Sequence, residues 1–155
     1  MIPMSMTFRY IDTANPDGST YKRPAIPVRF VNGDEVVEIP SLVDSGADMS
    51  SIDYRWADLL ELDTSGKRTR SYGVTGSVET VISHVDLEIY KGHEHYSLNI
   101  PIRVLFVKGT DPYTPTLLGR KGFFDRFRIT IDELGQKVIL KLNEVTGSSS
   151  CAMAL

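Results

Sequence analysis

The alternation of short apolar runs with turn residues is the feature that most constrains how this chain can fold. Such runs, rich in β-branched residues, cover residues 25–30, 35–39, 85–90, 96–107, 127–131 and 137–142. Short strands separated by turn residues are typical of an all-β sandwich or barrel and not of alternating βαβ units. We therefore expect strands to dominate the fold.

The same runs predict three hairpins. Residues 25–30 pair with 35–39 across an Asn-Gly-Asp turn, since Asn-Gly supplies the positive φ angles of a tight turn. The runs at 85–90 and 96–107 form the second pair, and those at 127–131 and 137–142 the third. Each hairpin is local in sequence, so each follows from periodicity alone.

Helical signals are sparse. Residues 53–62 place Trp56, Leu59 and Leu60 at helical spacing behind Asp53 or Ser51 as the N-cap. Residues 122–127 can form one or two helical turns, and residues 12–21 are expected to be a loop. We divide the chain into an N-terminal loop or arm (1–24), one domain (25–142) and a flexible C-terminal tail (143–155).

Size and charge limit the classes of function. A chain of 155 residues is long enough to bury one core of its own. Its formal net charge is −3 with scattered Lys and Arg, so no basic patch predicts nucleic acid or an anionic membrane as a partner. A single cysteine, Cys151, and no apolar leader favour a soluble protein of the reducing cytoplasm.

The stretch L-V-D-S-G-A-D at 42–48 places an acid directly after an expected buried strand. A carboxylate there is held by rigid backbone, as catalysis requires. Gly46 permits close approach of another backbone, and the Ser45 hydroxyl can donate to a neighbouring main chain. The pattern suits two such loops meeting face to face, with two carboxylates sharing one proton and activating water.

These residues resemble a known family. Residues 42–48 resemble the active-site loop of retropepsin-like aspartic proteases, in which two apolar residues precede Asp, Thr or Ser, Gly and Ala. T-L-L-G-R at 116–120 resembles the second landmark of that family, and S-Y-G-V-T-G-S-V-E-T at 71–80 its flap hairpin. The resemblance spans about residues 25–142 and implies a small closed all-β barrel with one or two short helices.

The resemblance also assigns roles to residues. It makes Asp44 the catalytic aspartate, with Ser45, Gly46 and Ala47 as active-site supports. Asp48 matches the position that binds the substrate backbone and forms a structural ion pair with the arginine of the Gly-Arg landmark, here Arg120. The flap tip falls on Gly73, Val74, Thr75 and Gly76, without the double glycine pairs of viral members. No cofactor or metal is implied.

A single active-site loop is present, and the chemistry needs two. The resemblance therefore implies a homodimer with C2 symmetry, whose two Asp44 carboxylates activate water to hydrolyse a peptide or protein substrate. The implied function is that of an aspartic endopeptidase. The alternative is a weak or inactive member that keeps the fold as a peptide-binding or dimerisation module.

Other interpretations of the same residues stay open at this stage. Asp44 can cap an Asx turn, which Asp-Ser-Gly commonly forms. Asp-Ser-Gly also surrounds the nucleophile of trypsin-like serine proteases, but here all three histidines follow the serine in the chain. Asp63-Thr64-Ser65-Gly66 is interpreted as a turn that ends a helix. His93 and His95 have metal-ligand spacing on what we expect to be an exposed hairpin tip.

Overall fold

The computed structural model describes residues 4–74, 76–109 and 113–144, and its described part is mostly β-strand. One helix is found in these residues, α1 (Tyr54–Leu59). The strands are β1 (Met6–Arg9), β2 (Ile11–Ala14), β3 (Thr20–Arg23), β4 (Ala25–Asn32), β5 (Glu35–Val43), β6 (Ser50–Asp53), β7 (Thr69–Gly73), β8 (Gly76–Lys91), β9 (Glu94–Phe106), β10 (Thr116–Leu118), β11 (Phe127–Asp132) and β12 (Lys137–Leu142).

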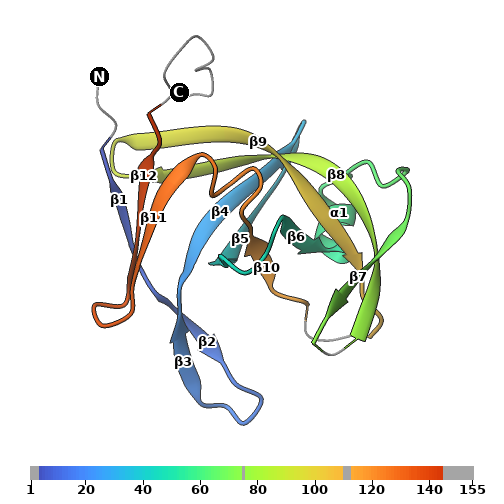
Figure 1. Ribbon diagram of the computed structural model, residues 1–155, viewed down its shortest axis with the longest axis horizontal. Coiled ribbons are helices and arrows are strands. Elements are labelled where there is room, and N and C mark those ends of the chain that lie inside the picture. Colours follow the sequence, from blue (N-terminus) through green and yellow to red (C-terminus); the bar gives the residue numbers. More distant parts are fainter. Residues whose placement is uncertain (1–3, 75, 110–112, 145–155) are drawn as a thin grey trace.

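Six of these strands close into a barrel (Figure 1). The order is β4-β5-β10-β6-β9-β8, and β8 pairs back onto β4 to complete the ring. Alternate residues of each strand point inward, as the period of a strand requires. Ile26, Val28 and Phe30 of β4 are buried with Ile100 and Ile102 of β9 in one apolar core. The predicted all-β closed barrel is therefore confirmed.

The three predicted hairpins are present. β4 pairs with β5, β8 with β9 and β11 with β12, all antiparallel. In the first, Gly33 has a φ of +61°, and the strands extend to Asn32 and Glu35 on either side of the turn. The second is much longer than its apolar runs, because β8 and β9 stay paired from Glu79 and Phe106 to the turn at Gly92.

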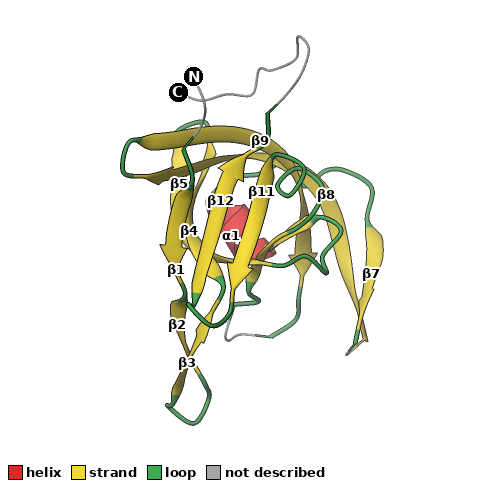
Figure 2. Cartoon of the chain, turned by 60° about the vertical axis from the view of Figure 1, so that its left-hand side comes forward, coloured by secondary structure: helices red, strands yellow, loops and turns green. Residues whose placement is uncertain are grey.

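A second sheet, β1-β12-β11, covers one side of the barrel (Figure 2). Met6 and Phe8 of β1 and Val138 and Leu140 of β12 are buried in the common core. β1 and β12 pair with each other within the chain, with Phe8 opposite Val138. Both ends of the described chain are thus tied into one intrachain sheet.

The expected loop at residues 12–21 is wrong. β2 and β3 form a separate two-stranded hairpin that projects from the barrel (Figures 1 and 2). Periodicity could not find it, because its strands have four residues each and carry mainly polar side chains. The domain boundaries at 24 and 142 stay predictions, and the tail from residue 145, with Cys151, lies outside the described residues.

The helix predictions have different outcomes. α1 begins behind Asp53, whose Oδ1 accepts a hydrogen bond from the Arg55 backbone N–H, so the predicted N-cap is confirmed. Residues 122–126 form consecutive turns instead of a helix, and Phe127 begins β11. No helix in the described ranges is long and apolar enough to cross a membrane.

Candidate active site

Asp44 stands at the end of β5, where β10 lies between β5 and β6. β10 runs parallel to β5, with Leu118 opposite Val43, and antiparallel to β6. The Asp44 backbone N–H donates to the Leu118 carbonyl at 3.0 Å, and its Oδ1 accepts from the Gly46 N–H at 2.8 Å. Backbone and carboxylate are therefore both fixed, each by a partner from the main chain.

The loop that carries Asp44 is joined to the segment after β10. The Arg120 N–H donates to the Ala47 carbonyl and the Lys121 N–H to the Asp48 carbonyl, both at 2.9 Å. Gly119 lies where the two segments cross, and its N–H donates to the Ser50 Oγ at 3.0 Å.

Gly119 is required by this crossing. A Cβ at this position would lie 2.4 Å from the carbonyl carbon of Met49, a distance that real Cβ atoms do not tolerate. The sequence pairing of L-V-D-S-G-A-D with L-L-G-R is thus a physical pairing. The crossing also holds the Asp44 loop at the surface, with Asp44 and Ala47 half-buried and Ser45 and Gly46 exposed.

The predicted ion pair between Asp48 and Arg120 is wrong. Asp48 pairs with Arg103 of β9, whose Nη1 lies 2.9 Å from its Oδ1. The hydrogen bond from Arg103 lowers the pKa of Asp48 below its ordinary value. β6 and β9 pair in parallel with Ser51 opposite Arg103, and this register carries the guanidinium to Asp48. Arg120 contributes its backbone to the site, and its side chain is exposed.

The predicted flap is a β-hairpin made of β7 and the start of β8. Gly73 faces Gly76 across the turn, and Val74 is fully exposed at the tip. Thr75, the fourth residue assigned to the tip, lies outside the described residues. The predicted hairpin is confirmed, while its role as a flap stays a prediction.

A cleft of about 1040 Å³ lies between this hairpin and the end of β9. Tyr72 and Val78 line it from the hairpin, and Phe106 lines it from β9. Leu117 also lines the cleft, one residue before the carbonyl that holds Asp44. The cleft therefore adjoins the strand that fixes the carboxylate.

Asp53 is a positioning residue that the sequence interpretation missed, because it was considered only as a helix cap. Its side chain is fully buried, its Oδ2 lies 2.7 Å from Arg55 Nη2, and Oδ2 also accepts from the Thr114 N–H at 3.0 Å. The Arg55 guanidinium lies 4.1 Å from the centre of the Tyr113 ring. Asp53 thereby anchors the segment that enters β10.

The pKa of Asp53 reflects two opposing effects. Burial alone would raise it, but hydrogen bonds from the Arg55 side chain and from the backbone of Arg55 and Thr114 favour the charged form. The net result is a pKa below the ordinary value of an aspartate. The anchor is therefore a charged carboxylate at neutral pH.

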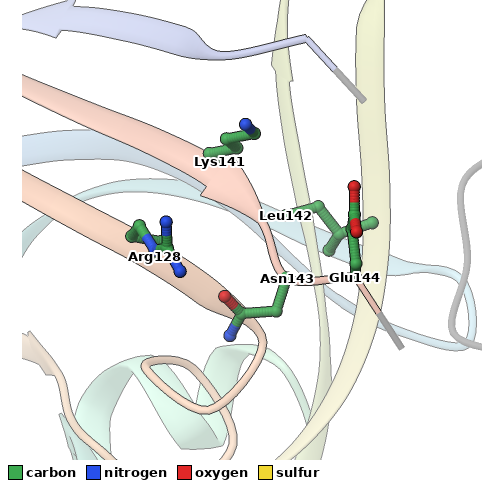
Figure 3. Close-up of a pocket in the computed structure, with 5 residues that line it drawn as sticks. All are labelled: Arg128, Lys141, Leu142, Asn143 and Glu144. Atoms are coloured by element: carbon green, nitrogen blue, oxygen red, sulfur yellow. The ribbon is translucent and has the colours of Figure 1, made fainter. Parts of the chain in front are cut away.

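Two other regions hold no comparable site. His93 lies at the exposed β8–β9 turn, and the described residues contain no group of His, Cys, Asp and Glu arranged to hold a metal ion. A hollow of about 520 Å³ at the end of β12, drawn in Figure 3, is lined by Arg128, Lys141 and Glu144 among others. It contains no residue of the Asp44 loop or of the β7–β8 hairpin.

The barrel, the crossed loops and the hairpin beside the cleft define the class of single-lobed retropepsin-like folds. A family model described as "Aspartyl protease" matches residues 26–119, more than half of the chain. The chain belongs to the retropepsin-like aspartyl protease family.

One solved structure supports this fold. The chain is similar to a retropepsin-like aspartic protease from Rickettsia conorii, with 24% identity, a TM-score of 0.57, and coverage of 90% of this chain and 94% of that chain. It is also similar to the EIAV protease complexed with the inhibitor HBY-793, with 26% identity, a TM-score of 0.41, and coverage of 70% and 88%. No curated protein matches the chain.

Proposed function

We propose that the protein is an aspartic endopeptidase that works as a homodimer, with Asp44 of each subunit as one half of the site. The observation that carries the proposal is the double restraint on Asp44, by the Leu118 carbonyl and by the Gly46 N–H. A half-exposed carboxylate fixed in this way is preorganised for a partner carboxylate. Membership of the aspartyl protease family supports the same function.

The proposed mechanism uses two identical loops across a two-fold axis. Two Asp44 carboxylates in contact share one proton, because both cannot be ionised at that distance. The ionised one takes a proton from a water between them while that water attacks the peptide carbonyl. The protonated one donates to the carbonyl oxygen, and the tetrahedral intermediate then breaks down with proton transfer to the leaving amine. Ser45, Gly46 and Ala47 hold the loops together in this proposal.

The proposed substrate is an extended peptide bound in the cleft beside the β7–β8 hairpin. In the described residues β7 is the last strand of its sheet and pairs only with β8, so within this part of the chain its other edge is open to backbone hydrogen bonds. Tyr72 and Phe106 give the cleft apolar walls for alternate side chains. Asp48 and the tip residues Gly73, Val74, Thr75 and Gly76 complete the proposed binding site.

Digestion of a peptide library between about pH 4 and 7 tests the proposal. We expect cleavage by the wild-type chain and a loss of at least about 10²-fold in the Asp44→Asn variant, since the shared proton requires both carboxylates. Mixtures of wild-type and Asp44→Asn chains test whether the site is shared between two subunits. Excess Asp44→Asn chains should lower wild-type turnover as mixed dimers form, because each mixed dimer has a single carboxylate.

Sedimentation across a dilution series completes the test. Specific activity should fall with the dimer fraction, because a monomer carries half of the site. A stable dimer without Asp44-dependent cleavage would contradict the proposed activity and favour a peptide-binding module.

A further inference from the structure

The β2–β3 hairpin has no partner within the described chain. It forms a two-stranded sheet of its own, joined by four residue pairs from Ile11–Arg23 to Ala14–Thr20. Figures 1 and 2 both show it projecting from the barrel, on the end of the molecule toward which the strands β7 and β8 also extend. An isolated two-stranded hairpin is at best marginally stable in water. A partner that packed against this arm would therefore stabilise the hairpin.

The base of the arm touches the strand that leads to Asp44. Directly after β3, the Pro24 carbonyl accepts a hydrogen bond from the Val43 N–H at 2.9 Å. A groove of about 340 Å³ lies at this base, lined by β2, by Leu42 and by Pro115 and Thr116. Thr116 is 2% exposed, and its hydroxyl has no hydrogen-bond partner in the described ranges. That hydroxyl is buried and not open to the groove, whose lining is partly apolar through Leu42 and Pro115.

The two faces of the arm differ. One face carries the ion pair between Asp12 and Lys22. The other carries Ile11 and Tyr21, and Tyr21 is 44% exposed with the Arg23 guanidinium 5.8 Å from its ring centre. Aromatic residues and arginine are enriched in protein interfaces, whereas lysine and aspartate are depleted.

The tip of the arm is ordered by its own hydrogen bonds. The Ser19 N–H and hydroxyl both donate to Asp17 Oδ1, at 2.9 and 2.6 Å, and the Asn15 side chain donates to Ser19 Oγ. The Ser19 hydroxyl is the main cause that lowers the pKa of Asp17. A preordered arm loses less conformational entropy when it docks, which favours binding.

We propose that the β2–β3 hairpin is the dimerisation arm, which packs its Tyr21 face into the groove at the base of the arm of a second copy of this chain. This inference rests on the proposed function, because it explains how a second Asp44 loop is brought to the first. A two-fold interface uses the same patch on both subunits. The arm and the groove are adjacent on each subunit. When two subunits face each other across the two-fold axis, each arm can therefore enter the groove of its partner.

The terminal strands are poorly suited to exchange between subunits. β1 and β12 already pair with each other within the chain and pack on the core through Phe8 and Leu140. Exchanging them between subunits would first require breaking that sheet. In the described residues β2 and β3 form a sheet of their own, so the β2–β3 arm can dock without strand exchange.

Tyr21→Asp tests the arm, with Thr20→Asp as its matched control on the opposite face. We expect the dimer dissociation constant, measured by sedimentation, to rise at least tenfold for Tyr21→Asp and less than twofold for Thr20→Asp. Circular dichroism should show that both variants are folded. Equal dissociation constants for Tyr21→Asp and the wild type would overturn the inference, as would equal weakening by both substitutions.

Hydrogen exchange on the wild-type chain gives a second measurement that needs no variant. Backbone amides of β2 and β3 should exchange more slowly above the dimer dissociation constant than below it. Exchange that is independent of concentration would overturn the inference. Both measurements are independent of turnover. A dimer that depends on the arm but shows no Asp44-dependent cleavage would refute the proposed activity and still support the role of the arm in dimerisation.

Discussion

Two turns in this chain have nearly the same local structure and different surroundings. Asp44 Oδ1 accepts from the N–H two residues later at 2.8 Å, and Asp63 Oδ1 accepts from the Ser65 N–H at 2.9 Å. Asp63 also accepts from the Ser65 hydroxyl at 2.6 Å. By the geometry of the turn alone, either aspartate could be the functional one.

The difference lies in what holds each turn in place. The Asp44 N–H donates a hydrogen bond to the Leu118 carbonyl. The adjacent Gly119 lets the segment after β10 cross against the backbone of Met49. Asp63 follows α1 in an exposed loop. An aspartate that accepts a hydrogen bond from the N–H two residues later thus specifies only a turn, and contacts with a strand distant in sequence decide whether that turn is a candidate site.

The largest expected effect is on catalysis and separates the two turns directly. Asp44→Asn should reduce peptide cleavage by about 10²–10⁴-fold, the usual contribution of a general acid or base. Asp63→Asn should leave the cleavage rate within about twofold, because its carboxylate lies outside the proposed mechanism. The measurement is kcat/KM on one peptide at equal dimer concentration. Equal losses in the two variants would contradict the distinction.

The crossing at Gly119 can be broken without touching a carboxylate. Gly119→Ala should destabilise the fold by an amount at the upper end of the roughly 1–3 kcal/mol that overpacking costs, because its Cβ meets the Met49 backbone. Gly73→Ala is the control, since a Cβ there meets nothing within 4 Å. Urea unfolding of both variants gives the free energies. Similar losses would show that the crossing is not the constraint.

The Asp53 anchor predicts a pH dependence of stability. Its pKa is lowered in the fold, so its charge stabilises the protein above about pH 4 and that contribution disappears as the pH falls through the folded pKa. Asp53→Asn should cost about 1–3 kcal/mol at pH 7, from the lost partner of Arg55 and Thr114, and less below about pH 4. Unfolding measured at both pH values checks this.

Asp58→Asn is the control for the Asp53 anchor, because Asp58 lies exposed on the same helix. Its free energy of unfolding should differ little from that of the wild type at either pH. A cost for Asp53→Asn that is the same at both pH values would contradict the charged anchor.

The smallest expected effect distinguishes the two arginines near Asp48. Arg103→Met should raise the pKa of Asp48 toward its ordinary value and cost less than about 1 kcal/mol, as exposed ion pairs usually do. Arg120→Met should leave the pKa of Asp48 unchanged. Carboxyl chemical shifts during a pH titration give both values. A rise in Arg120→Met alone would restore the pairing that the sequence had predicted.

Local patterns in the sequence were sufficient for the hairpins and for the Asp44 loop. β4 and β5, or β11 and β12, are contiguous alternating runs whose partner is the next run along the chain. The partner of Asp48 could not be found in this way, because it depends on the register of the parallel β6–β9 pair. The β2–β3 hairpin escaped notice because its residues do not alternate between apolar and polar.

The insertion of β10 between β5 and β6 also determines when the site can exist. Residues 41–43 and 116–118 are distant in sequence, and contacts of such separation form slowly because a long loop must close first. When the ribosome has released the chain only as far as β9, Asp44 is already outside it. The Leu118 carbonyl, which accepts the hydrogen bond from the Asp44 N–H, is not yet available. The order of synthesis thus delays the fixing of the Asp44 loop, the proposed half-site, until the barrel is nearly complete.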